Sequence, residues 1–103
     1  MKKADFVKEI ESIYGTQQSK MINGYRFIDK EEIIHTGWLS DIELKRCEKW
    51  IQVEIFDKET NEWCEDERFY YIGYKIKPCC AKTLANKMWN EYENYGWQGA
   101  YGV

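Results

Sequence analysis

WIQVEIF at residues 50–56 and RFYYIGYKI at residues 68–76 are the two stretches that decide the fold class. Both are rich in the β-branched and aromatic residues that favour strands. The acidic segment DKETNEWCEDE, residues 57–67, joins them. We therefore expect an antiparallel pair of strands with the acidic segment as its solvated hairpin tip.

Side chains alternate between the two faces of a strand, which sorts the residues of this pair into two sets. In the first strand, Ile51, Val53 and Ile55 form an aliphatic side that we expect to face the core. In the second strand, Tyr70 and Ile72 are assigned to the same side. The opposite, mixed side is then expected to carry the surplus aromatic residues Trp50, Phe56, Phe69 and Tyr71. Exposed aromatic area of this size is uncommon on a monomer and marks a binding surface.

Two amphipathic segments flank the pair of strands. Apolar residues at helical spacing predict a helix from about Lys3 to Tyr14, which Gly15 ends. After Pro78, the spacing of Leu84, Met88 and Tyr92 predicts a second helix that closes at Gly96. The result is an α+β fold, with a small antiparallel sheet flanked by an N-terminal and a C-terminal helix. A length of 103 residues fits a single domain over residues 1–103.

The segment between the first helix and Trp50 is harder to interpret. Residues 25–28 and 32–36 flank a charged turn and predict a short hairpin. Ser40 and Glu43 match a capping box, which predicts a short helix, whereas a strand that continues into Trp50 is the alternative. Both alternatives stay open for residues 37–49.

The chain ends in NYGWQGAYGV, residues 94–103, and residues 96–103 are expected to form a glycine- and aromatic-rich tail. Trp97 and Tyr101 lie between the glycines of this tail. Two roles are open for them. The tail covers the mixed aromatic face of the sheet, or it joins that face in binding a partner.

Composition narrows the class of partner. The net charge of −3 argues against direct nucleic-acid binding, because affinity for phosphate comes from clustered Lys and Arg. Five Trp and eight Tyr are the residues that anchor protein interfaces. Residues 57–67 hold six acids and one base, a net charge of −5. This acidic patch is expected to meet a basic site on a partner, including a nucleic-acid-binding groove. With no signal peptide and no apolar run of ~20 residues, a cytoplasmic protein is expected.

Residues capable of catalysis are sparse. His35 is the one histidine, and Glu31 and Glu32 nearby make a carboxylate-oriented base conceivable. A second histidine and a motif around a Ser or Cys nucleophile are both missing, so we expect no catalytic residues. The alternative is a small enzyme or ligand-binding protein with an aromatic pocket near His35.

The sequence also predicts no metal site and no cofactor. Cys47, Cys64, Cys79 and Cys80 lack the paired spacing of a zinc site and are expected to be reduced thiols. The acidic segment fails as a calcium loop, because the glycine and the final glutamate of such a loop are absent.

The sequence therefore predicts a non-enzymatic protein-binding module, with a homodimer as one form of partner. Its small size and its richness in Lys, Glu, Ile and Tyr are typical of accessory proteins of phages and mobile elements, some of which inhibit host nucleases or defence complexes. The expected partner-binding residues are Trp50, Phe56, Phe69, Tyr71, Trp97, Tyr101, Glu62, Glu65, Asp66 and Glu67.

Overall fold

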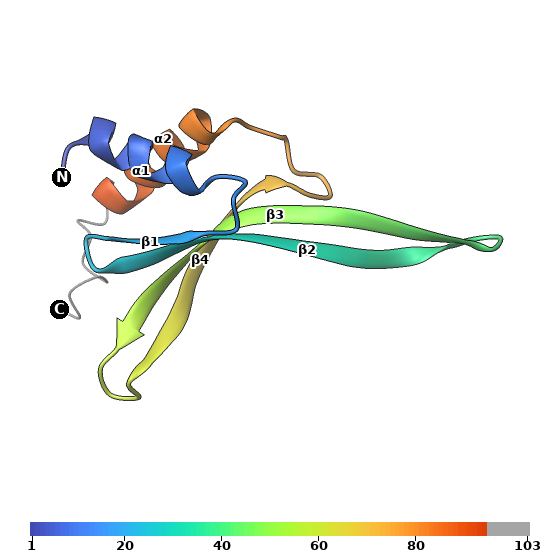
Figure 1. Cartoon of the computed structure of the whole chain (residues 1–103), viewed down its shortest axis with the longest axis horizontal. Coiled ribbons are helices and arrows are strands. Elements are labelled where there is room, and N and C mark those ends of the chain that lie inside the picture. Colours follow the sequence, from blue (N-terminus) through green and yellow to red (C-terminus); the bar gives the residue numbers. More distant parts are fainter. Residues whose placement is uncertain (95–103) are drawn as a thin grey trace.

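The computed structural model describes residues 1–94 and contains two helices and four strands. In chain order these are α1 (Lys3–Ile13), β1 (Ser19–Ile22), β2 (Tyr25–Leu39), β3 (Ile42–Asp57), β4 (Glu62–Ile72) and α2 (Ala81–Asn94). The strands form one antiparallel sheet in the order β1-β2-β3-β4. Both helices lie on the same side of this sheet (Figure 1), and we call that side the inner face and the other side the outer face. The expected α+β fold is confirmed.

The two helices bury the apolar stripes that their sequences predict. In α1 the buried residues are Phe6, Val7, Ile10 and Ile13. In α2 they are Leu84, Ala85, Met88 and Tyr92. Just after α1, Gly15 has a φ of 75°, a left-handed conformation that glycine adopts without steric cost. Both helices therefore pack on the sheet through the faces expected from their 3.6-residue periodicity.

The first hairpin turn lies at Asn23 and Gly24, whose φ angles are 51° and 85°. Positive φ at both central residues is typical of a type I′ turn, for which Asn-Gly is the preferred dipeptide. The expected hairpin between residues 25–28 and 32–36 is wrong, because β2 runs through both segments without a break. The charged residues between these two segments do not form a turn but lie within one long strand.

The second hairpin turn lies at Ser40 and Asp41, between Leu39 and Ile42, which pair with each other. Ser40 has a φ of 56°, which fits the first central residue of a type II′ turn. Of the two alternatives for residues 37–49, the structure has the strand and not the helix.

The third turn is shorter than the acidic segment that the sequence placed there. β3 continues to Asp57 and β4 begins at Glu62, so the acids at 62–67 belong to a strand and not to a hairpin tip. At its other end β4 stops at Ile72, before the expected limit at residue 76.

The pairing of β3 with β4 corrects the predicted faces. Ile51 lies opposite Phe69, and Trp50 lies opposite Tyr70. Opposite residues of an antiparallel pair share a face, so Phe69 points to the inner face, and Tyr71 joins it in the core. The prediction that Phe69 and Tyr71 share a face with Trp50 and Phe56 is therefore wrong. Alternation within one strand defines two sides, but the register decides which side meets the helices, and a shift of one residue exchanges them.

An aromatic cluster joins the helices to the inner face. The ring centroids of Phe6 and Phe27 lie 5.7 Å apart, and those of Phe27 and Tyr92 lie 6.2 Å apart. Phe69 lies 6.1 Å from Tyr92. These contacts connect α1, β2, α2 and β4 around one core, in the edge-to-face and tilted geometries that aromatic pairs favour.

One carboxylate lies inside this core. Asp29 is buried on β2 and accepts hydrogen bonds from the Tyr71 hydroxyl and from the backbone N–H of Gln17, at 2.9 Å for the latter. Burial, followed by the hydrogen bond to Asp29, raises the pKa of Tyr71. A buried carboxylate is tolerated only when such partners replace its hydration.

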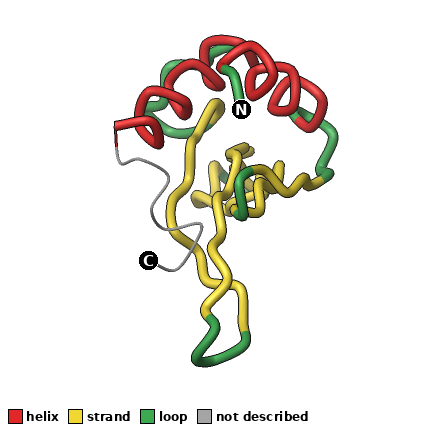
Figure 2. The backbone as a smooth tube through the Cα atoms, turned by 90° about the vertical axis from the view of Figure 1, so that its left-hand side faces the viewer, coloured by secondary structure: helices red, strands yellow, loops and turns green. Residues whose placement is uncertain are grey.

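The β2–β3 hairpin extends far beyond this core. β1 pairs with β2 only as far as Ile28, and β4 pairs with β3 only as far as Lys49, so residues 32–48 form a ribbon of two strands. We call this ribbon the arm; it projects to the right in Figure 1 and points away from the helices. Figure 2 shows the same molecule along the arm, with both helices above the sheet. The radius of gyration, 15.7 Å, exceeds the ~13 Å of a compact chain of about 100 residues.

We expect Tyr71→Phe to lower the free energy of unfolding by about 1–2 kcal/mol, because Asp29 then loses a buried hydrogen-bond donor. Tyr70→Phe is the matched control, because Tyr70 lies on the same strand and its hydroxyl bonds the exposed Arg68. The control should cost less than about 0.5 kcal/mol. Urea unfolding of the two variants measures both values, and equal losses would contradict the role of Asp29.

Candidate functional site

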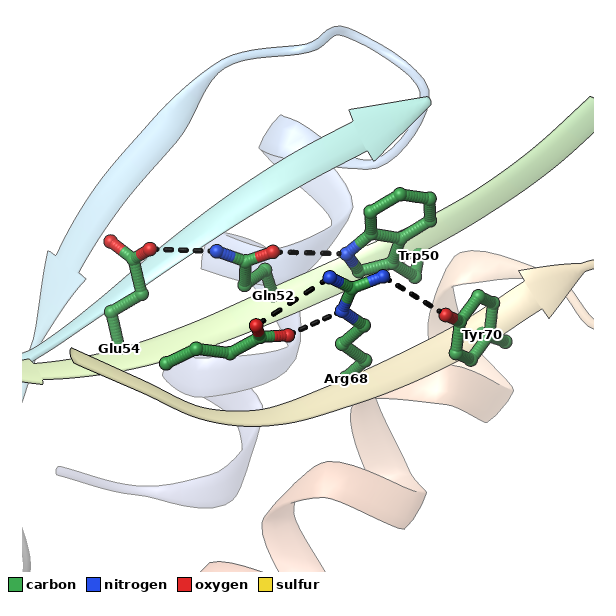
Figure 3. A network of polar contacts seen from close by, with 6 residues as sticks. Trp50, Gln52, Glu54, Arg68 and Tyr70 are labelled. Atoms are coloured by element: carbon green, nitrogen blue, oxygen red, sulfur yellow. Dashed lines mark hydrogen bonds and ion pairs between the residues drawn. The ribbon is translucent and has the colours of Figure 1, made fainter. Parts of the chain in front are cut away.

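The outer face of β3 carries a chain of hydrogen bonds. The indole N–H of Trp50 donates to Oε1 of Gln52 at 3.2 Å, and Nε2 of Gln52 donates to Oε2 of Glu54 at 2.7 Å (Figure 3). All three side chains are buried, although both helices lie on the other face. The outer face is therefore covered by its own side chains.

Arg68 provides part of this cover. Its guanidinium carbon lies 4.5 Å from the ring of Trp50, a cation–π distance. The same guanidinium binds the carboxylate of Glu65 and donates to the Tyr70 hydroxyl at 3.2 Å (Figure 3). Tyr70 in turn lies 5.3 Å from Trp50, measured between ring centroids. The indole is thus enclosed by an arginine and a tyrosine from the neighbouring strand.

A second arginine repeats the arrangement one strand away. The guanidinium of Arg26 lies 4.5 Å from the ring of Trp63 and forms an ion pair with Glu54. Trp63 also contacts Phe56 at 5.4 Å between ring centroids. Both arginines of the outer face are therefore stacked on tryptophans and neutralised by glutamates.

The aromatic residues expected to bind a partner are consequently separated. Phe69 and Tyr71 lie in the core, and Trp50 lies beneath Arg68. Phe56 is 40% exposed. Nothing in these contacts tests whether the residues bind a partner, so that role stays a prediction. Trp97 and Tyr101 lie outside the described residues, as does the question of whether residues 96–103 cover the sheet.

The acids expected to form one patch are also divided. Glu65 binds Arg68, and Asp66 accepts a hydrogen bond from the Tyr92 hydroxyl at 2.9 Å. Glu67 is hydrogen-bonded to Glu91 of α2. Glu62 is exposed beside the turn at residues 58–61. The binding role of these four acids stays a prediction, but three of them already have partners within the chain.

The arm presents five large apolar side chains to solvent. Their exposed fractions are 58% for Ile33, 65% for Trp38, 64% for Leu39, 64% for Ile42 and 40% for Leu44. Leu39 pairs with Ile42, and Leu44 lies two residues along the same face of β3. Trp38 pairs with Glu43, so it occupies the opposite face of the ribbon. Apolar side chains therefore lie on both faces of the arm tip.

Contacts within and between the two strands hold the arm together. His35 contacts Trp38 at 5.5 Å between ring centroids, and its Nδ1 lies 3.0 Å from Oε1 of Glu43. Lys45 also pairs with Glu43, at 3.4 Å. The register shifts at Thr36, whose hydroxyl donates to the Leu44 carbonyl at 3.1 Å. The two contacts that cross between the strands, His35 with Glu43 and Thr36 with Leu44, stabilise the ribbon without a third strand. The sequence did not predict the arm, although its two-residue turn and flanking β-branched residues are a recognisable signal.

A cleft of about 420 Å³ lies between β4, residues 75–77 and α2, and no residue of the arm lines it. It contains the hydrogen-bonded pair of Glu67 and Glu91. Burial, followed by the hydrogen bond to Glu91, raises the pKa of Glu67 to about 7. His35 does not line this cleft but lies on the exposed arm. The alternative of a pocket built around His35 gains no support from it.

The four cysteines are free thiols in the structure. Within residues 1–94, no three His, Cys, Asp or Glu side chains gather closely enough to hold a metal ion. The reduced, metal-free and cofactor-free state stays a prediction. Neither of the two described helices has the length and apolar character needed to cross a membrane.

Comparison of the chain with models of protein families, with curated protein sequences and with solved structures gave no match. The class of the protein therefore rests on its fold, an α+β sheet with a projecting arm, and its function on the surfaces described above.

Arg68→Ala should lower the free energy of unfolding by about 1 kcal/mol, because the guanidinium and its stem no longer cover Trp50. It should also increase quenching of tryptophan fluorescence by acrylamide. Lys58→Ala, in the exposed turn, should change neither quantity. Unchanged quenching in Arg68→Ala would show that other groups cover the indole.

The Glu67 carboxyl binds its proton more tightly in the folded chain, with a pKa of about 7 against 4.5 for the unperturbed group. Its ionisation therefore opposes folding. The destabilisation is absent below the unfolded value, grows as pH rises between the two values and is complete above the folded one. Glu67→Gln should stabilise the protein by about 1 kcal/mol near pH 8, after allowance for solvent screening, and by much less near pH 5.

Chemical unfolding of Glu67→Gln and wild type across this pH range measures the effect. Glu62→Gln, exposed at the neighbouring turn, is the control and should follow the wild-type profile. A constant difference between Glu67→Gln and wild type at all pH values would contradict the raised pKa.

Proposed function

We propose that this chain is a non-enzymatic protein-binding module that inserts the tip of its arm into an apolar cleft of a partner protein. One observation carries the proposal: five large apolar side chains of the arm are 40–65% exposed on a ribbon that projects from the core. Large apolar side chains that gather in solvent on one element mark interaction sites on soluble proteins. Neither helix covers the arm, because both helices lie over the other end of the sheet (Figure 1).

The dimensions of the arm support a cleft in preference to a flat surface. Residues 33–39 span roughly 24 Å at ~3.4 Å per residue, and a ribbon of two strands about 5 Å apart is roughly 10 Å wide. One face then offers roughly 240 Å², well below the ~800 Å² per partner of a standard interface. Apolar residues occupy both faces, Leu39 and Ile42 on one and Trp38 on the other. A partner that encloses the ribbon buries both faces at once.

The charges of the arm favour protein over lipid or nucleic acid. Asp41 lies in the turn at the leading end, and a carboxylate there opposes entry into hydrocarbon by about 3 kcal/mol. Behind the tip, Lys45 pairs with Glu43 and Arg46 pairs with Glu48, so the basic groups are already neutralised. We therefore expect the cleft of the partner to be apolar along its walls and basic or hydrated where Asp41 arrives.

A narrower form of the proposal concerns the consequence of binding. If the partner is a nuclease or a defence complex, insertion of the arm would inhibit it, as some accessory proteins of phages and mobile elements do. The exposed acids near the turn at residues 58–61, among them Glu59 and Glu62, would suit a basic groove next to the cleft. Cytoplasmic action is part of this narrower form.

Site-specific photocrosslinking in the organism that carries the gene tests the proposal. Trp38 is replaced by benzoylphenylalanine, and illumination should give one dominant protein adduct of defined mass. Met21, which is 57% exposed on β1, receives the same group as the control and should give no such adduct. Its exposure matches that of Trp38, but it lies outside the arm.

The substitutions Leu39→Ser and Ile42→Ser, combined with the crosslinker at Trp38, should abolish the adduct. They should change the free energy of unfolding by no more than about 0.5 kcal/mol each, because both side chains are exposed. An adduct with a second copy of the chain would identify a homodimer. Crosslinks only to lipid would contradict a protein partner and would show that the arm binds a membrane. Equal labelling at Met21 and Trp38 would overturn the role of the arm.

A further inference from the structure

The cleft near α2 opens onto the free edge of β4. Four consecutive residues of the strand, 67–70, line it, although their side chains alternate between the two faces of the sheet. A cleft that is lined from both faces lies at the edge of a strand. β4 is an edge strand, with β3 as its one partner among the described residues. Backbone N–H and C=O groups along such an edge are available to another strand.

The walls of the cleft combine an apolar floor with a cationic mouth. Phe69 and Leu84 are buried and supply apolar surface from β4 and α2. Lys75, Lys77 and Lys87 are exposed and surround the opening. Lys75 has a φ of 58°, so the chain turns sharply beside the cleft.

The lysines at the mouth lack a carboxylate partner within the described chain, although the ammonium of Lys75 lies 5.3 Å from the centre of the Tyr74 ring. No carboxylate of residues 1–94 forms an ion pair with Lys75, Lys77 or Lys87. The acids of the cleft, Glu67 and Glu91, are hydrogen-bonded to each other. The mouth of the cleft is therefore complementary to a negatively charged ligand.

We propose that this cleft binds an extended acidic peptide segment of a protein, which adds to the edge of β4 as a fifth strand. Backbone hydrogen bonds to residues 67–70 would hold roughly four residues of the segment, since these residues span about 13 Å. Alternate side chains would reach the apolar floor, and acidic side chains between them would meet Lys75, Lys77 and Lys87. The site is separate from the arm and does not depend on the function proposed for it.

The peptide acetyl-EVEVE-amide is a suitable probe, titrated into the isotope-labelled full-length chain and followed by NMR. We expect the backbone amides of residues 67–70 and 75–77 to shift, with a Kd of about 1 mM or tighter. Amide exchange along the same stretch of β4 should slow. Absence of shifts in this region would overturn the proposal.

Three related ligands distinguish the contributions of charge, of backbone hydrogen bonds and of simple anion binding to the affinity of the peptide. The peptide acetyl-KVKVK-amide should not bind, and binding equal to that of the acidic peptide would refute charge complementarity. A version of the acidic peptide with N-methylated alternate amides should lose affinity, and equal binding would refute strand addition. Free glutarate should shift these amides far less than the peptide does, and an equal effect would make the cleft a site for small anions instead.

Variants of the protein complete the test. Lys77→Glu and Lys87→Glu should each weaken peptide binding about tenfold, because each reverses a charge at the mouth. Lys82→Glu is the matched control, since Lys82 is exposed on the same helix but does not line this cleft. Trp38→Ser should leave peptide binding unchanged, so failure of the arm as an interaction surface and failure of this site are separate outcomes. Equal affinities of Lys82→Glu and Lys87→Glu would overturn the assignment of the mouth.

Discussion

Burial of β3 on both faces between Trp50 and Glu54 is the constraint on which the rest of the structure depends. On the inner face Ile51 and Val53 pack beneath the helices, as in any two-layer α+β fold. On the outer face no helix is present among the described residues, and Arg26 and Arg68 stack on tryptophans to cover that side instead. One helical layer and one layer of long side chains therefore enclose the sheet.

This second layer depends on the match between arginine and tryptophan. The guanidinium is planar and weakly hydrated, so it can lie on an indole ring while its N–H groups bond a carboxylate. Glu54 and Glu65 provide those carboxylates, and Gln52 satisfies the indole N–H of Trp50. Polar groups that are buried in this way are stable only when every partner is in place. The same arrangement buries Trp50 beneath Arg68.

The surface around the core is therefore covered by side chains of the chain itself, whereas the arm and the edge of β4 remain exposed. The aromatic residues of the core, among them Phe27, Phe69 and Tyr71, are buried. Three of the expected acidic binding residues have partners within the chain. Beyond the core, the arm keeps its apolar residues in solvent because a ribbon of two strands has no layer to cover them. The edge of β4 is open for a related reason, since the sheet ends there and α2 leaves a cleft beside it.

The sequence by itself determined the class of fold and both helices, because the 3.6-residue spacing of residues such as Leu84 and Met88 allows only one buried face. It also indicated that β3 and β4 pair. Only the tertiary structure decided which sides of these strands meet the helices. Ile51 and Phe69 look like members of opposite sets in the sequence, yet register places them together. The turn of the arm has a local signal in the sequence, but the length of the arm depends on where β1 and β4 stop pairing, and those are contacts between distant segments.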